Sequence, residues 1–165
     1  MRGQGGRPMR INASGRYGVR AILQLALSDR GKPISIRELS SIVGISPGIL
    51  EQIFFNLRKS GIVKSTRGPS GGFQMDRNPA MVTVKDIFDA TGEEIVLTLC
   101  TSDDCSRAPC SRENVCLAYD MWVETADHIN GYFKSITIQD ILKKNQRSSG
   151  SGNPNHSATH VSASD

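Results

Sequence analysis

The chain has 165 residues, 38% of them hydrophobic and 22% charged, which is typical of a soluble globular protein with one domain and an appended element. No apolar run approaches the length of a membrane span and residues 1–10 lack the apolar stretch of a secretory signal, so a cytoplasmic location is expected. The net charge of +4 is unevenly distributed along the chain. Residues 9–79 hold eleven Lys or Arg and four Asp or Glu, whereas residues 80–145 hold six Lys or Arg and eleven Asp or Glu. This distribution suggests that only the first half meets a polyanion.

The first elements predicted along the chain are a disordered leader and a helix. Residues 1–8 offer no apolar side chain beyond Met1 and cannot offset the entropy of ordering, and Met9 is an alternative start. Residues 14–28 then carry apolar side chains at helical spacing, which predicts an amphipathic helix that ends at the Gly-Lys-Pro of residues 31–33. The apolar positions of that helix are Tyr17, Ala21, Ile22, Leu25 and Ala26.

Two further helices separated by a glycine follow. Ser35 and Glu38 form a capping-box pattern that opens a short helix ending at Gly44, and Ser46 with Pro47 fits the N-cap and first position of the next helix. Such a pair of helices is typical of a helix-turn-helix motif. The second helix is predicted to bury Ile49, Leu50, Ile53, Phe54 and Leu57 on one face. Its other face is predicted to show Gly48, Glu51, Gln52, Arg58 and Lys59.

A glycine-rich hairpin comes next. Residues 62–66 alternate as a strand, residues 67–72 form a tight turn, and residues 73–75 return as a second strand. A helix-turn-helix followed by such a hairpin predicts a mainly α fold with a small β-wing, in which residues 9–80 form a winged helix-turn-helix DNA-binding domain. A helical domain with an idle hairpin is the alternative, and the basic excess of this half argues against it.

All four cysteines of the chain fall in one short segment. Residues 82–90 predict a short helix ended by Gly92, within a connecting segment at 81–99, and the polar, turn-forming residues 100–116 follow. Thiolates gathered on one loop can share a soft metal centre, whereas stable disulfides are rare in the cytoplasm. Metal or iron–sulfur ligation is therefore favoured, and redox thiols or zinc are the alternatives. The candidate ligands are Cys100, Cys105, Cys110 and Cys116.

A long helix is predicted over residues 116–136, because apolar residues recur there at alternating steps of four and three, as in a coiled coil. This stripe predicts a homodimer interface, although packing on its own domain is an alternative compatible with it. The interface residues are Trp122, Ile129, Tyr132 and Ile136. Residues 137–142 then cap a short terminal helix, so that residues 117–145 form the dimerisation region, and the polar residues 146–165 are predicted to be a disordered tail.

The order of these parts resembles the iron–sulfur cluster regulator family of winged-helix transcription factors, the IscR/NsrR/RirA/CymR group. The matching stretches are MRINASGRYGVRAIL (9–23), GISPGILEQIFFNLRKSGIV (44–63), RGPSGGF (67–73), CLAYDMW (116–122) and ITIQDIL (136–142). The resemblance implies a homodimer joined by crossed long helices, a pseudo-palindromic operator in double-stranded DNA, and one iron–sulfur cluster per subunit, with 2Fe–2S favoured over 4Fe–4S.

The resemblance also implies roles for particular residues. Glu51 and Gln52 would enter the major groove, and Arg67 on the wing would reach the minor groove, roles that suit side chains able to bond to base edges. The other predicted DNA contacts are Ser46, Gly48, Arg58, Lys59, Gly68, Ser70 and Gly71.

The cluster ligands are where the sequence departs from this family. Cluster-bearing members use three loop cysteines of which the last two are separated by five residues, as Cys110 and Cys116 are. The third is then Cys105 or Cys100, because the earlier spacing varies among members. Either all four cysteines ligate, or three do so together with an external or unrecognised ligand.

Two positions that supply a fourth ligand in some members are occupied here by Tyr119 and Arg16, neither of which suits iron. The predicted function is a DNA-binding transcriptional regulator controlled by its cluster and sensing iron, redox state or nitric oxide. A cluster-free regulator of the same fold is the alternative, and a cluster-bearing redox protein is less favoured. An enzyme is not expected, because the sequence has no nucleotide-binding glycine fingerprint and no Ser/His/Asp or Cys/His arrangement.

Overall fold

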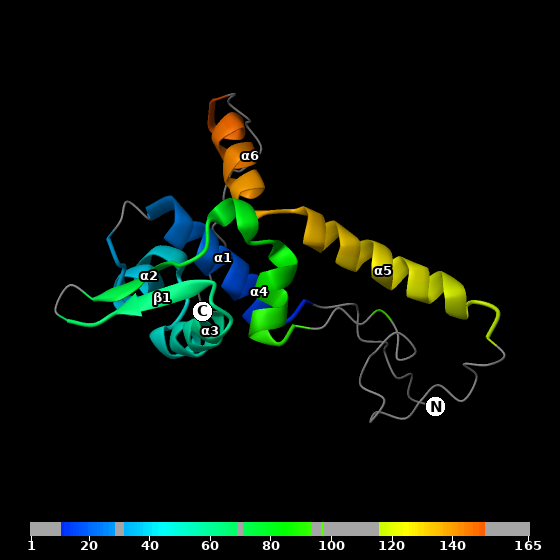
Figure 1. The fold of residues 1–165 in the computed structure, drawn as a ribbon, viewed down its shortest axis with the longest axis horizontal. Coiled ribbons are helices and arrows are strands. Elements are labelled where there is room, and N and C mark those ends of the chain that lie inside the picture. Colours follow the sequence, from blue (N-terminus) through cyan, green and yellow to red (C-terminus); the bar gives the residue numbers. More distant parts are fainter. Residues whose placement is uncertain (1–10, 29–31, 69–70, 94–96, 98–115, 151–165) are drawn as a thin grey trace, which may run out of the picture.

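The computed structural model describes residues 11–28, 32–68, 71–93, 97 and 116–150. Within them the chain forms six α-helices, one short 3-10 helix and a two-stranded antiparallel sheet (Figure 1). The mainly α fold with a small β-wing is thereby confirmed. In order, the elements are α1 (Ala13–Ser28), α2 (Ile36–Val43), α3 (Pro47–Lys59), β1 (Val63–Thr66), β2 (Gly72–Met75), η1 (Pro79–Met81), α4 (Val84–Thr91), α5 (Tyr119–Ser135) and α6 (Ile138–Gly150).

The core lies where α1, α2, α3 and α4 face one another. Its largest fully buried side chains include Phe54, Ile22, Leu25, Leu39, Leu50 and Leu57. In α3 the buried residues recur at steps of three and four, as the sequence predicts, but Ile49 is 45% exposed, so its predicted burial was wrong. Consecutive residues are about 100° apart around a helix, which places Ile49 at the edge of the buried face rather than within it.

Local side-chain bonds fix where the helices of this domain begin and end. Ser35 Oγ accepts the Glu38 N–H at 3.2 Å at the start of α2, and Gly44 ends that helix in the left-handed conformation at a φ of 65°. A complete capping box that the sequence analysis did not predict opens α4, where Thr83 Oγ1 accepts the Asp86 N–H at 3.1 Å and Asp86 Oδ2 accepts the Thr83 N–H at 2.8 Å.

The wing is attached to the helical domain at its base. Strands β1 and β2 pair in a register that sets Val63 opposite Met75. Phe73 also exchanges two backbone hydrogen bonds with Ile34, at 2.9 and 2.8 Å, and its ring packs on that of Phe54 with a centroid separation of 4.8 Å. The wing is therefore fixed relative to α3 by contacts that the residues of the hairpin alone do not determine.

The C-terminal part of the chain returns to the winged domain between two projecting helices. Helix α5 extends away from the domain and α6 rises from it (Figure 1). The segment between them is bonded to the chain around the start of α4, because Val84 N–H donates to Ile136 O at 3.0 Å and Ile138 N–H donates to Val82 O at 2.9 Å. Ile138 is fully buried.

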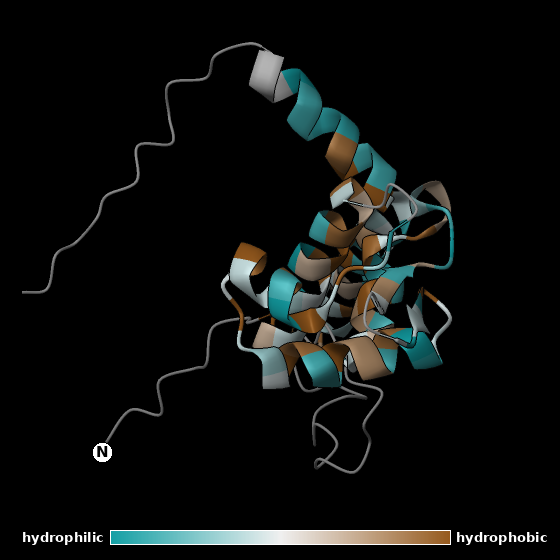
Figure 2. Cartoon of the chain, turned by 90° about the vertical axis from the view of Figure 1, so that its left-hand side faces the viewer, coloured by the Kyte–Doolittle hydropathy of each residue, from teal (hydrophilic) through white to brown (hydrophobic). Residues whose placement is uncertain are grey.

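Helix α6 is longer than predicted, because residues 146–150, assigned above to the tail, continue it. Once a capped first turn exists, each added helical residue costs little, and Gln146 and Arg147 at the start of this segment are good helix formers. Figure 2 shows α6 as mostly hydrophilic, with hydrophobic residues near its base. None of the described helices is long and apolar enough to cross a membrane.

Candidate nucleic-acid interface

The face of α3 opposite the core is polar, basic and exposed. Ser46 occupies the N-cap position without a side-chain capping bond, and Pro47 occupies the first helical position, where its missing N–H costs nothing. Since the buried residues occupy the other side, the outward face is free to meet a ligand. The predicted contact residues on it, all exposed, are Ser46, Gly48, Glu51, Gln52, Arg58 and Lys59.

A residue that the sequence analysis did not assign to this face is Phe55. Its side chain is 54% exposed, and the guanidinium carbon of Arg58 lies 5.9 Å from the centre of its ring. The signal was available in the helical period, because position 55 falls outside the spacing of the buried residues. Of the two adjacent phenylalanines, only Phe54 is predicted to be buried, as it is, and the prediction assigns Phe55 to neither face.

Arg58 also connects this face to the wing. Its Nη1 donates to Ser65 Oγ on β1 at 3.4 Å, so the outer face of α3 and the first wing strand form one continuous surface. Further exposed charges near these elements are Lys59 on α3 and Arg67, the residue after β1. An arrangement of this kind can place a helix in a groove while the wing contacts the adjoining backbone.

The tip of the wing depends on glycine. Gly68 has a φ of 117° and accepts the Gly71 N–H at 2.9 Å, which closes the turn. A Cβ on Gly71 would lie 2.4 Å from Thr66 O, so no other residue fits there without moving the backbone. Arg67 and Gly68 are exposed and Gly71 is half-buried, whereas Ser70 lies outside the described residues.

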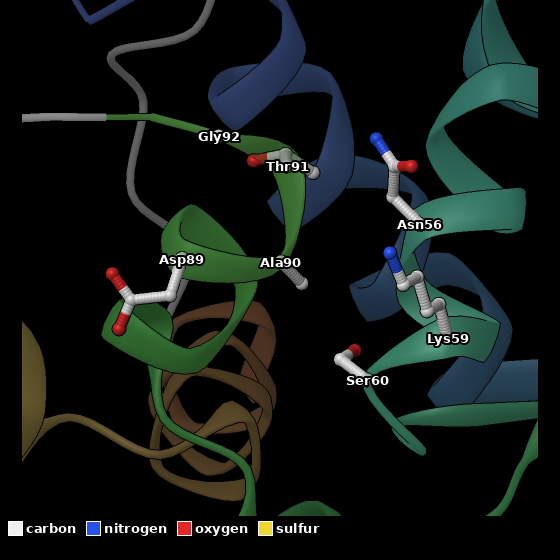
Figure 3. Close-up of a pocket in the computed structure, with 7 residues that line it drawn as sticks. All are labelled: Asn56, Lys59, Ser60, Asp89, Ala90, Thr91 and Gly92. Carbon is white, nitrogen blue, oxygen red and sulfur yellow. The ribbon is translucent and has the colours of Figure 1, made fainter.

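A hollow lies beside this surface, between the C-terminal ends of α3 and α4 (Figure 3). It has a volume of about 460 Å³. In Figure 3, Asn56 and Lys59 extend from α3 on one side and Asp89 to Gly92 lie on the other. Lys59 therefore stands at the border between the outer face of α3 and the hollow. The lining residues are Asn56, Lys59, Ser60, Asp89, Ala90, Thr91 and Gly92.

Of the four predicted metal ligands, the structure describes Cys116, while Cys100, Cys105 and Cys110 lie outside the described residues. Cys116 is half-buried, and its carbonyl accepts the Tyr119 N–H at 3.1 Å in the turn that opens α5. Its thiol has no disulfide partner within the described ranges, nor do three His, Cys, Asp or Glu side chains gather there.

Before the cysteine segment, the chain after α4 is bonded to the residue that precedes α1. Glu93, two residues after α4, is 4% exposed, and its Oε1 accepts the Asn12 N–H at 2.7 Å, just before α1 begins. Its Oε2 is buried with no donor among the residues described. A Cβ on Gly15 would lie 3.0 Å from Glu93 Cγ, so the close approach depends on that glycine. Glu93, seven residues before Cys100, is therefore held against the start of the chain's first helix.

Part of the apolar stripe of α5 packs on the winged domain, and the rest of it is exposed. Ala126 is buried, and Phe133 packs edge-on against Phe88 of α4 with a centroid separation of 5.1 Å. Trp122 and Tyr132 remain 37% and 58% exposed. Ile129 and Ile136 are half-buried, and Leu117 and Met121 add further exposed apolar surface.

An apolar cavity of about 430 Å³ lies where α1, α4, α5 and α6 meet. Two of the predicted interface residues, Tyr132 and Ile136, line it, and the others in its wall come from all four helices. These are Arg16, Val19, Val84, Phe88, Phe133, Ile141 and Lys144. The exposed part of the α5 stripe is thus continuous with a concave apolar surface.

Comparison with known proteins agrees with this arrangement. The family described as Rrf2, iron-dependent transcriptional regulator, matches residues 11–144. ORF2 of Azotobacter vinelandii, a predicted HTH-type transcriptional regulator, is 34% identical over 94% of this chain and 98% of its own. The HTH-type transcriptional regulator IscR of Escherichia coli O1:K1 is 31% identical over 84% of this chain and 83% of its own.

Two solved structures are also similar. The structure of T. potens IscR superposes with a TM-score of 0.66 at 29% identity, covering 88% of this chain and 93% of that one. The cysteine regulator CymR of B. subtilis superposes with a TM-score of 0.63 at 24% identity, over 82% of this chain and 97% of its own, a level that supports the fold alone.

Proposed function

Since the chain belongs to the Rrf2 family of iron-dependent transcriptional regulators, we propose that residues 9–80 read an operator, residues 100–116 hold an iron–sulfur cluster that controls the reading, and residues 117–145 join two copies. The observation that carries the proposal is the continuous surface of α3 and β1, joined by the bond between Arg58 and Ser65. A basic first half and a glycine-built wing tip support the same assignment.

Sequence choice is assigned to α3 and general affinity to the wing. Gln52 can bond to an adenine edge, whereas the Glu51 carboxylate repels phosphate unless it accepts from a cytosine amino group. Glu51→Ala should therefore relax sequence choice, and Arg67→Ala should weaken binding to all sequences by about 1–3 kcal/mol. Affinities across an operator library measure both effects, and equal profiles for the two variants would contradict the division.

The cysteine segment is assigned to the cluster. The donor set suits it, because soft thiolates are the usual ligands of iron–sulfur clusters and Cys116 offers a half-buried thiol in a turn rather than within a helix. Cys110 and Cys116 would be two of the ligands, with Cys105, Cys100 or both completing the set. A bound cluster supplies a group whose integrity responds to iron, oxidants or nitric oxide, and 2Fe–2S is favoured over 4Fe–4S.

The absorption spectrum of anaerobically purified protein tests this assignment, together with iron and sulfide analysis. A cluster gives a brown protein, whereas zinc or free thiols leave it colourless. Cys110→Ala and Cys116→Ala should each abolish the spectrum, and Cys100→Ala and Cys105→Ala, made singly, should show which of these two is essential. Full retention of iron and sulfide in Cys116→Ala would contradict the assignment.

The exposed stripe of α5 is assigned to a homodimer. A single recognition helix reads few base pairs, and two-fold pairing doubles the site and makes it pseudo-palindromic. Trp122→Asp would place a carboxylate in the seam and should give monomers that bind DNA poorly. The matched control is Gly131→Asp, because Gly131 is exposed on the same helix with nothing within 4 Å of an added Cβ. Sedimentation measures both, and a dimeric Trp122→Asp would place the interface elsewhere.

The cluster is proposed to act by fixing the path of the chain between the winged domain and α5. Glu93 anchors one end of the intervening segment to α1, and Cys116 lies at its other end. Losing a shared centre would release this constraint on the spacing of the two recognition helices. A coupling of about 1–3 kcal/mol changes operator affinity roughly 5–150-fold. Holo and apo protein should be compared at one salt concentration, since phosphate contacts are salt-dependent, and equal affinities for every operator would remove the regulatory role.

A further inference from the structure

Phe55 is an exposed aromatic residue on a face whose other members are polar or charged. It follows Glu51 by four residues and Gln52 by three, and it precedes Arg58 by three and Lys59 by four. Residues three and four apart are neighbours on a helix surface, so Phe55 is surrounded by the side chains proposed above to meet DNA. With 54% of its surface exposed, it does not contribute to the core as Phe54 does.

The exposed ring contacts a neighbouring cation. The Arg58 guanidinium lies over it at 5.9 Å, a distance at which a cation is attracted to an aromatic face. Arg58 is itself bonded to Ser65 on the wing. The aromatic ring is therefore presented outward beside a cation that is fixed to both DNA-facing elements.

The charged residues around Phe55 indicate which kind of partner would cover it. Arg58 and Lys59 flank it on the C-terminal side, so a polyanion is attracted to the surface that surrounds the ring. An apolar ring offers no hydrogen bond to a base edge, and placing it against donor and acceptor atoms would desolvate them without compensation. Thymine is the base that presents an apolar group in the major groove, its 5-methyl.

We propose that Phe55 is a specificity-determining residue that selects thymine in each half-site by packing its ring on the 5-methyl group. The inference rests on the DNA-reading function proposed above and extends it to a residue with no hydrogen-bonding group. Glu51 and Gln52 then hydrogen-bond to the polar edges of neighbouring base pairs, and Phe55 contacts the apolar methyl group of thymine. Removing that methyl group leaves every hydrogen bond of the base pair intact, so the contribution of the Phe55–methyl contact to affinity can be measured separately from that of the hydrogen bonds.

The test replaces thymine by uracil, one position at a time, in an operator selected from a random library by the wild-type protein. Affinities are measured by fluorescence anisotropy at one salt concentration, for wild type, Phe55→Ala and Met81→Ala. Met81 is the matched control, because it is an exposed apolar residue, at 67%, on η1 rather than α3. Burying one methyl-sized group is worth about 0.8 kcal/mol, which corresponds to roughly fourfold in affinity per half-site.

The expected result is a thymine position at which wild type and Met81→Ala lose about fourfold per half-site with uracil, and at which Phe55→Ala binds both operators equally. A wild-type protein indifferent to uracil at every thymine would overturn the inference without any variant being needed. An undiminished preference for thymine in folded Phe55→Ala would also overturn it. Failure of the underlying function looks different, because no sequence would then be enriched from the library.

Discussion

Gly72→Ala should detach the wing from the helical domain. Gly72 begins β2, and a Cβ there would lie 2.3 Å from Ile34 O and 2.4 Å from Ile34 C, both backbone atoms. Contacts this short cannot be absorbed by turning a side chain. The neighbouring Phe73 exchanges two backbone hydrogen bonds with Ile34, so the added methyl group forces this pairing apart.

The size of the destabilisation follows from the contacts that Gly72→Ala breaks. A backbone hydrogen bond contributes about 0.5–1.5 kcal/mol, and two are broken. Displacing Phe73 also weakens its aromatic contact with Phe54, which is worth about 0.5–1.5 kcal/mol beyond the buried area. The free energy of unfolding should therefore fall by about 2–4 kcal/mol. For a slope near 2 kcal/mol/M, the urea midpoint should drop by ~1–2 M.

Urea denaturation followed by circular dichroism measures this loss, and operator affinity under native conditions should fall as well, because the wing is displaced from α3. Gly131→Ala is the control, since its added methyl group meets nothing within 4 Å in an exposed helical position and should raise stability or leave it unchanged. If Gly72→Ala shifted the midpoint no more than this control, the proposed attachment of the wing through Ile34 would be refuted.

Three further predictions concern the remaining contacts. Gly44→Ala should cost about 1–2 kcal/mol in chemical denaturation, because its φ of 65° is strained for a residue with a Cβ, and Gly44→Asn should cost less. Hydrogen bonds from the Thr137 hydroxyl and N–H lower the pKa of Asp140 below its ordinary value of 3.8. The ionised carboxylate therefore stabilises the fold above that pH, and this stabilisation is lost as pH falls through the lowered pKa. Asp140→Asn should therefore be less stable than wild type near pH 6, and the difference between their unfolding midpoints should shrink as pH falls below the ordinary Asp range; a difference that does not change with pH would contradict this. Ile138→Ala should cost about 2–5 kcal/mol in thermal or urea unfolding because Ile138 is fully buried against the winged domain, whereas Leu117→Ala, at a fully exposed position, should change little.

The local order of this protein is readable from its sequence because short-range physics decides it. The buried positions Leu50, Ile53, Phe54 and Leu57 follow the helical period, and the start and end of α2 follow from the hydroxyl of Ser35 and the left-handed tolerance of Gly44. The winged fold follows from the order of such elements. The same locality makes the four cysteines recognisable as a group, since they are neighbours in the chain.

Other features depend on residues far apart in the chain, and only tertiary structure decides them. The sequence does not indicate that Ile34 pairs with Phe73, that Glu93 reaches the start of α1, or that Ile138 returns to Val82, because no periodicity relates these positions. Ile49 illustrates the division most directly. The helical period of α3 leaves it at the edge of the buried face, and the packing leaves it 45% exposed, because burial is a property of the packed structure rather than of the residue.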